Sequence, residues 1–346
     1  MRKVLVATCV AAALLAGCGP AGRTPDAQPR GDASISAGSS GSGGSKGTEA
    51  PPAGIVWISK DGVSRRFGVF DPVTGALLHV SMLPASVGAI GLSTRSFTAD
   101  RKFLTSNYLV NGSLCSIIVL KWTGFEYREH AVLDPRASFS GGKLCYGIPQ
   151  VRAGRIWATL GEPKLPSNNP PQKVVSIDPA DPKAPARVEQ ENVTMVSSEA
   201  TVQGGQMEPV QIRTLGGRPE GFDVRGRLDI QTGEHVKANY ACDQRVDDAT
   251  VLCLGYGPFG SVAFAKLDVA ARTIAMTLVV PESPAKLAVA MLSPDGKQVL
   301  LRTNNGWFRA DVGGTKEPAR MFDKLQFPPD VGDPDFFPAS QWYGWI

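Results

Sequence analysis

The sequence predicts an all-β protein built from repeated four-stranded units, and three observations support this. Short runs of Val, Ile, Leu, Phe and Trp recur from Gly54 onward between Gly, Asp and Pro turns, without a long helical period. One device, an apolar strand followed by Asp, a turn and another apolar strand, returns along the chain. The intervals between its copies approach the length of one four-stranded unit.

The N-terminus predicts export. Residues 4–16 form an apolar core of 13 residues behind Arg2 and Lys3, which is short of the roughly 20 residues that span a bilayer. The core ends in Leu15-Ala16-Gly17-Cys18, which resembles the lipobox of bacterial lipoproteins. The resemblance implies that residues 1–17 are a cleaved signal peptide and that Cys18 is lipidated. The palmitate-type anchor would hold the chain at the extracytoplasmic face of the cell membrane. A plain secretory signal is the alternative.

A tether follows the signal peptide. Residues 18–52 are dominated by Gly, Ser, Ala, Pro and Thr, so they cannot bury a core and are expected to be disordered. A flexible chain of this length spans roughly 30–35 Å. The third segment, residues 53–346, holds the whole predicted domain.

The charge balance indicates the class of ligand, and the cysteine content indicates the redox compartment. The chain carries 36 basic and 32 acidic side chains, and the basic ones are scattered, so a nucleic-acid ligand is not expected. Four cysteines remain when Cys9 of the signal peptide and the lipidated Cys18 are set aside, and an exported chain is expected to pair them. Cys242 and Cys253 flank a polar turn symmetrically, which suits a cross-strand disulfide. Cys115 and Cys145 then pair by elimination.

The spacing of the Asp-turn copies indicates the length of the repeated four-stranded unit. Copies stand at Asp71, Asp178, Asp229, Asp268 and Asp311, and Lys121 occupies the Asp position of a degenerate copy. The successive intervals are 50, 57, 51, 39 and 43 residues, close to the 40–50 residues of a propeller blade. The aspartates are predicted to be structural, because the carboxylate accepts backbone N–H groups and closes the hairpin. A β-propeller of six or seven blades is therefore expected, with a pair of β-sandwiches as the alternative.

A second device supports the propeller. The segment Ser293-Pro294-Asp295-Gly296-Lys297 resembles the turn of TolB-like, WD40-like propeller repeats, and Thr98-Ala99-Asp100-Arg101-Lys102 is a version without the glycine. The Asp-turn copies are similar to the hairpins of YncE-like propellers. The aromatic tail, residues 335–346, is expected to close the ring against residues 55–58. An exposed aromatic platform is the alternative for this tail.

No catalytic motif stands out in the folded region. Nucleophile elbows, metalloprotease helices and phosphate-binding loops are absent from the sequence, so no catalytic residue and no cofactor is assigned. The three histidines, His79, His130 and His235, lie far apart and are expected at the surface or in turns. Asp330, Asp333 and Asp335 form the densest carboxylate group, for which a turn is favoured over Ca2+. No metal site is predicted.

These observations favour a lipid-anchored propeller, monomeric, that acts as a binding or protein-interaction module at the cell envelope. The TolB-like resemblance implies protein partners, and a glycan is the other ligand class. The alternative is a propeller hydrolase or lyase that acts on cell-wall or exogenous glycans. A solute-binding lipoprotein is disfavoured because the repeats lack a βαβ alternation.

Overall fold

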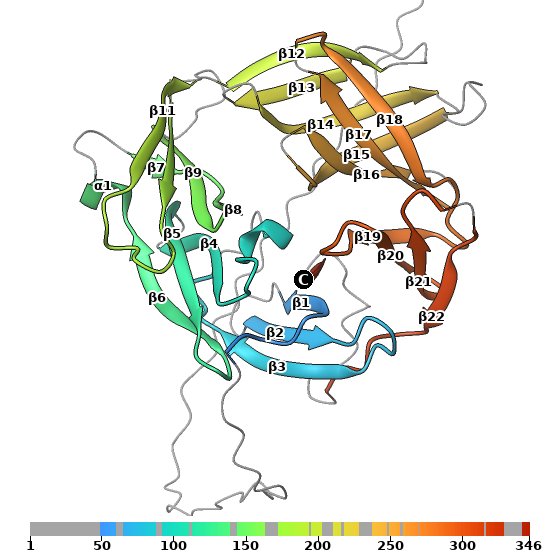
Figure 1. The fold of residues 1–346 in the computed structure, drawn as a ribbon, viewed down its shortest axis with the longest axis horizontal. Helices are drawn as coiled ribbons and strands as arrows, with labels where there is room; N and C mark the ends of the chain where they lie inside the picture. Colours follow the sequence, from blue (N-terminus) through green and yellow to red (C-terminus); the bar gives the residue numbers. More distant parts are fainter. Residues whose placement is uncertain are drawn as a thin grey trace, which may run out of the picture. The chain divides into compact units, whose positions relative to one another are not determined.

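Five β-sheets follow one another around a central axis in the computed structural model, in a five-bladed β-propeller arrangement (Figure 1). The structure describes residues 49–59, 65–87, 92–110, 113–138, 144–162, 172–193, 195–202, 210–215, 218–227, 237–247, 249–256, 259–268, 270–314, 316–328 and 341–346. All the described residues lie in one unit, residues 45–346. The all-β prediction is confirmed, and the alternative of two sandwiches is not what is found.

The first sheet joins the two ends of the folded chain. Its order is β23-β1-β2-β3, with bounds Gln341–Trp345, Ile55–Ser59, Arg65–Phe70 and Leu77–Leu83. The antiparallel register pairs Ile55 with Trp345 and Ser59 with Gln341. Beyond the strand, Gly54 and Ile346 exchange two backbone hydrogen bonds of 2.8 and 3.0 Å. The expected closure by the aromatic tail is confirmed for these residues.

The second and third sheets continue the ring. The second is β4-β5-β6, with bounds Phe103–Val110, Ser113–Trp122 and Tyr127–Leu133. Before β4, the short 3-10 helix η1 (Thr94–Ser96) and the isolated bridge between Phe97 and Leu104 stand where an innermost strand would run. The third sheet has the order β11-β10-β9-β7 with β8 beside β9, and it follows the one-turn helix α1 (Pro135–Ser138). Its bounds are Cys145–Tyr146, Gln150–Arg152, Arg155–Gly161, Gln172–Ile177 and Arg187–Val193 for β7 to β11.

The fourth sheet is a closed barrel of seven strands rather than a four-stranded blade. Strands β12 to β18 have the bounds Met195–Val202, Val210–Leu215, Arg218–Arg227, Lys237–Arg245, Thr250–Tyr256, Ser261–Asp268 and Thr273–Val280. The barrel closes where β12 runs parallel to β18, with Thr201 opposite Thr273. The fifth sheet is β19-β20-β21-β22, with bounds Leu287–Leu292, Gln298–Thr303, Gly306–Asp311 and Ala319–Phe322.

The expectation of six or seven blades is wrong, and the barrel is the reason. Two copies of the Asp-turn device fall in this one sheet. Asp229, outside the described residues, stands in the chain between β14 and β15, and Asp268 ends β17. Their interval of 39 residues is therefore a distance within one closed sheet and not the length of a blade.

The Asp turns themselves are confirmed at Asp71, Asp178 and Asp268, whose carboxylates accept backbone N–H groups. The carboxylate of Asp71 accepts the N–H groups of Val73 and Thr74 at 2.7 and 2.9 Å, and these bonds hold the pKa of Asp71 below its usual range. In the second device, the Ser293 hydroxyl and the Lys297 N–H donate to Asp295 at 2.6 and 3.1 Å.

The version of this device without glycine has the same geometry. The Thr98 hydroxyl and the Lys102 N–H donate to Asp100 at 2.6 and 3.0 Å. Arg101 takes up the left-handed conformation, φ 59°, that Gly296 adopts in the other copy at φ 71°. These aspartates serve the scaffold, as expected.

Candidate functional site

Apolar side chains fill four of the five seams between neighbouring sheets. The first and second sheets share a cluster that includes Phe67, Leu83, Leu104, Ile118 and Leu120. The second and third share another, with members Ile117, Val119, Ile156, Leu160 and Val175. Clusters of the same kind join the barrel to the fifth sheet and the fifth sheet to the first. Among the side chains that the structure describes, no such cluster joins the third sheet to the barrel.

The third sheet turns a polar face toward that seam. On β9, Ile156, Ala158 and Leu160 point to the second sheet, so strand alternation sends Arg155 and Trp157 to the opposite face. Ser176 lies directly opposite Trp157 in the register, and Arg187 lies opposite Ser176. Two further residues belong to the same face. We call the set the arginine face: Arg152, Arg155, Trp157, Ser176, Arg187 and Glu189.

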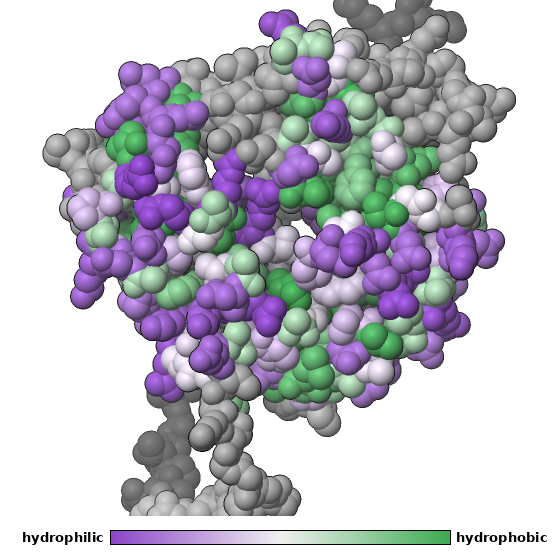
Figure 2. Space-filling model, viewed as in Figure 1, coloured by the Kyte–Doolittle hydropathy of each residue, from purple (hydrophilic) through white to green (hydrophobic). Residues whose placement is uncertain are grey.

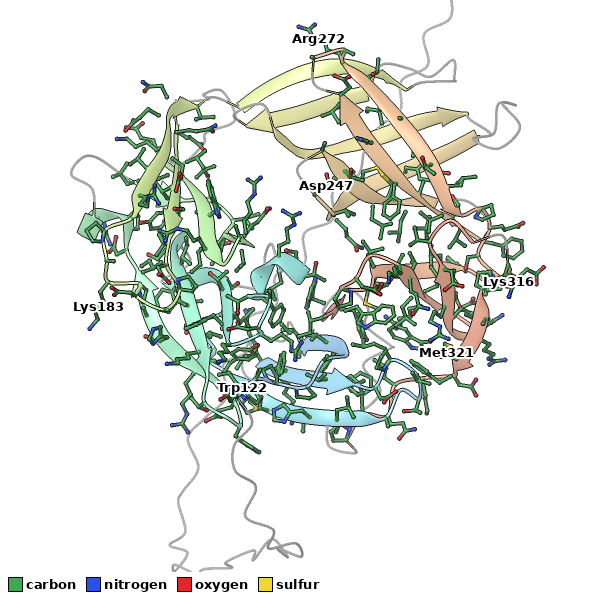
Figure 3. The ribbon with its side chains drawn as sticks, in the orientation of Figure 1. Trp122, Lys183, Asp247, Arg272, Lys316 and Met321 are labelled. Carbon is green, nitrogen blue, oxygen red and sulfur yellow. A yellow bond between two sulfur atoms is a disulfide. The ribbon has the colours of Figure 1, made fainter. Side chains whose placement is uncertain are left out.

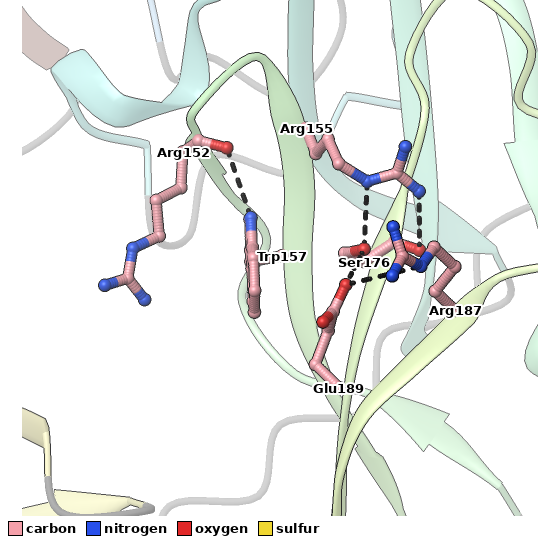
Figure 4. A network of polar contacts seen from close by, with 6 residues as sticks. All are labelled: Arg152, Arg155, Trp157, Ser176, Arg187 and Glu189. Carbon is pink, nitrogen blue, oxygen red and sulfur yellow. Dashed lines mark hydrogen bonds and ion pairs between the residues drawn. The ribbon is translucent and has the colours of Figure 1, made fainter.

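A buried serine organises the centre of the arginine face (Figure 4). Arg155 donates from Nε to Ser176 Oγ at 2.9 Å and from Nη2 to the Ser176 carbonyl at 3.4 Å. Ser176 Oγ in turn donates to Glu189 Oε1 at 2.5 Å. Arg187 Nε lies 4.0 Å from the same carboxylate oxygen. Ser176 is fully buried on β10, so its hydroxyl fixes two charged side chains on the neighbouring strands β9 and β11.

The inner end of the face carries an aromatic ring under a guanidinium. Trp157 donates from its indole nitrogen to the Arg152 carbonyl at 3.1 Å. The Arg152 guanidinium carbon stands 5.3 Å from the centre of the Trp157 ring, which is a cation–π distance. In Figure 4 the guanidinium group of Arg152 extends away from the sheet. Three guanidinium groups against one carboxylate make this face basic, and basic faces attract anions.

Another arginine, Arg95, reaches across the ring near the inner end of the arginine face. Arg95 of η1 donates from Nη2 to the Val246 carbonyl at 2.7 Å, in the turn between β15 and β16. Figure 3 shows Asp247, the next residue, toward the middle of the ring, while Lys183, Arg272 and Lys316 lie at its periphery. In Figure 2 hydrophilic residues lie beside the central opening on the side of the third sheet, and hydrophobic residues lie beside it on the side of the barrel.

Asp247 is charged at neutral pH, because the hydrogen bonds of its own turn favour the carboxylate. Burial works against the charged carboxylate, but the N–H groups of Ala249 and Thr250 donate to it at 2.8 and 2.7 Å. Together with the Arg95 charge they hold the pKa of Asp247 below its usual range. Asp247 is therefore a turn aspartate whose charge is also favoured by the positive charge of Arg95.

Both expected disulfides are present. Cys242 lies opposite Cys253 in the β15–β16 hairpin, with a Cα–Cα distance of 4.1 Å. Cys115 on β5 bonds Cys145 on β7 at a Cα–Cα distance of 4.2 Å. The second bridge therefore links the second sheet to the third. Cys18, the expected lipidation site, lies outside the described residues.

The histidines depart in part from expectation. His130 on β6 is exposed, as predicted. His79 on β3 is half-buried beside Trp122 and Phe125, with ring centroids 5.1 and 5.6 Å away. A surface position for His79 was therefore wrong, because β3 turns it toward the second sheet. His235 lies outside the described residues.

The described residues contain no group of three or more His, Cys, Asp or Glu side chains that is arranged to hold a metal ion. No helix in the described ranges is long and apolar enough to cross a bilayer. Asp330, Asp333 and Asp335, the dense carboxylate group of the sequence, lie outside these ranges.

Sequence reasoning did not find the arginine face. Its members stand on four strands between positions 152 and 189, and only the sheet register brings them together. One local signal was present: the alternation in β9 places Arg155 and Trp157 on the face opposite Ile156.

Comparison with known proteins leaves the family open. No known protein family matches the chain, and no curated protein matches it. Several solved structures are similar at low identity. A candidate 6-phosphogluconolactonase from Bacteroides fragilis is 14% identical, with a TM-score of 0.34, over 78% of this chain and 82% of that one. Apo AztD from Citrobacter koseri is 12% identical, with a TM-score of 0.32, over 80% and 83%.

A third structure is the periplasmic gluconolactonase PpgL of Pseudomonas aeruginosa. It is 12% identical, with a TM-score of 0.29, over 79% of this chain and 98% of that one. None of these similarities identifies a ligand or an activity for this protein. The propeller assignment therefore depends on the sheet order and on the closure of the ring, and the function depends on the arginine face.

Proposed function

We propose that the protein is a lipid-anchored, extracytoplasmic β-propeller that binds an acidic segment of an envelope protein through its arginine face. One observation carries the binding proposal: a seam that is apolar elsewhere in the ring is lined on the third sheet by Arg152, Arg155, Trp157 and Arg187. Arginine and tryptophan are the residue types that dominate binding energy at protein interfaces, which favours a protein over a glycan. The TolB-like sequence resemblance supports the same ligand class.

The scaffold supports a role in recognition. Ser176 holds Arg155 at two points, so part of the conformational entropy of that side chain is already lost before a ligand arrives. The Cys115–Cys145 bridge ties the second sheet to the third sheet behind the face. A preorganised guanidinium group recognises a carboxylate with more affinity and geometric selectivity than a mobile one.

The binding proposal is tested with a fluorescent oligoglutamate peptide as the probe, by anisotropy, at several salt concentrations. The test variant is Arg155→Gln with Arg187→Gln. The matched control, Lys183→Gln with Lys316→Gln, removes the same charge from exposed positions at the periphery of the ring. At least tenfold weaker binding is expected for the test variant and less than twofold for the control. Equal losses in both would show that net charge, and not this face, binds the peptide.

A parallel arm uses polygalacturonate in place of the peptide. Binding of the glycan alone would overturn the choice of a protein ligand. New reducing ends in the same samples would establish the hydrolase or lyase alternative. Both outcomes are read from wild-type protein, so they do not depend on the folding of a variant.

The anchor has its own test. Cells fed an alkyne-bearing fatty acid are expected to label the wild-type chain and not the Cys18→Ser variant. The wild-type chain should fractionate with membranes and the variant should be released. Labelling that survives in the variant would refute lipidation at Cys18.

A further inference from the structure

The face of the first sheet that packs on the second sheet contains a buried arginine. Arg65, at the start of β2, is 6% exposed, and its Nε and Nη1 have no hydrogen-bond partner among the residues that the structure describes. Burying a guanidinium ion without a counter-charge is costly. Removing the partner of a buried ion in a protein lowers stability by several kcal/mol. Burial also lowers the pKa of Arg65 from its ordinary value. An arginine keeps its proton at any physiological pH, so the group remains a cation.

The register places a hydroxyl group on the same face. Arg65 lies opposite Leu83, and Phe67 lies opposite Ser81. Ser81 is 8% exposed, and within the described part of the chain its buried Oγ also lacks a partner. Phe67 and Leu83 both belong to the cluster shared with the second sheet, so Arg65 and Ser81 point into that seam as well.

Two unsatisfied polar groups at diagonal positions of one strand pair are unusual. The large majority of buried side-chain polar groups in native proteins are hydrogen-bonded, and a bound water or ion is one explanation for an exception. Diagonal neighbours on one face have Cα atoms roughly 7–8 Å apart, which a long arginine side chain can span. A water molecule would satisfy the hydroxyl group but not the positive charge of Arg65.

We infer that the seam between the first and second sheets holds an oxyanion, a carboxylate, phosphate or sulfate group, bound by Arg65 and Ser81. Guanidinium donors in a fixed planar array match several oxygen acceptors at once, which favours an oxyanion over a halide. The Ser81 hydroxyl supplies one further donor. The site is independent of the arginine face, because it lies on a different sheet and uses none of the same residues.

The test measures urea unfolding of the full chain in phosphate, sulfate, acetate or chloride at one ionic strength. Wild-type protein should show a saturable rise in the unfolding midpoint with at least one oxyanion and not with chloride, because a ligand that binds only the native state stabilises it. Arg65→Gln should lose the saturable part. Lys121→Gln, which removes an exposed charge from the second sheet, should keep it. The Arg155→Gln and Arg187→Gln variant should also keep it, which separates this site from the proposed function.

Comparison of acetate with phosphate and sulfate identifies the chemical type of the bound anion. A preference for acetate points to a carboxylate, and a preference for phosphate or sulfate points to a tetrahedral group. An equal response to chloride, or a response that Arg65→Gln retains, would overturn the inference.

A second measurement does not depend on variants that fold. Wild-type crystals soaked in selenate are expected to show an anomalous peak within hydrogen-bond distance of the Arg65 guanidinium group. Peaks confined to the surface would contradict the site.

Discussion

The two disulfides are expected to contribute unequally to stability, and their loop lengths give the order. Cys115 and Cys145 are 30 residues apart, and Cys242 and Cys253 are 11 apart. A cross-link removes loop-closure entropy from the unfolded chain in proportion to the logarithm of loop length. At 25 °C the longer loop is worth about 3.6 kcal/mol and the shorter about 2.8 kcal/mol.

The two cysteine pairs differ in burial, so the experiment must separate the packing contribution from the loop-entropy contribution. Cys242 and Cys253 are buried at 2% and 0% exposure, whereas Cys115 and Cys145 are only partly buried. Replacing a pair by alanine would add a cavity term to the entropy term. Each bridge is therefore measured in the variant that lacks the other one, as the difference between its oxidised and reduced forms.

The assay is urea unfolding followed by tryptophan fluorescence and circular dichroism, whose transitions must coincide. The Cys242→Ala and Cys253→Ala variant should lose about 3.6 kcal/mol on reduction of its remaining bridge. The complementary variant should lose about 2.8 kcal/mol. A loss below about 1 kcal/mol for either bridge, or a reversed order, would refute the loop-entropy reasoning and indicate residual structure around that bridge in the unfolded chain.

Three further predictions concern single residues. Burial lowers the pKa of His79, so the unfolded state binds more protons and stability should fall as pH drops below about 6.5; His79→Gln should flatten that slope in pH-dependent urea melts, whereas exposed His130→Gln should not. Ala153→Asn should raise stability by about 0.5–1 kcal/mol in the same melts, because Ala153 holds φ 46° in a two-residue turn that favours Asn-Gly; an unchanged midpoint would count against strain there. Arg95→Met should cost about 1.5–3 kcal/mol through the lost charged hydrogen bond to Val246, and a change under 0.5 kcal/mol would show that the bridge is dispensable.

Local chemistry made much of the fold predictable. The turn at Ser293–Lys297 and its version at Thr98–Lys102 have the same hydrogen bonds because a hydroxyl two residues before an aspartate dictates them. The Cys242–Cys253 pairing followed from the symmetry of one hairpin. Such features depend on residues a few positions apart, which a sequence displays directly.

Long-range pairing could not be predicted in the same way. The barrel closes through Thr201 and Thr273, which are 72 positions apart, and no local pattern marks that parallel contact. The blade count failed for this reason. The arginine face was missed because Ser176, a fully buried polar residue, has a role only once its neighbours on β9 and β11 are known.

Because β23 closes the ring, one edge of the first sheet stays open until the last described strand has been synthesised. Strand β1 is made before every other described strand, but one of its edges pairs only with β23, made after all of them. Until then Ile55 and Trp57 lack part of the surface that buries them. A chain that stops early therefore presents an apolar open edge to proteases, whereas a complete chain hides it.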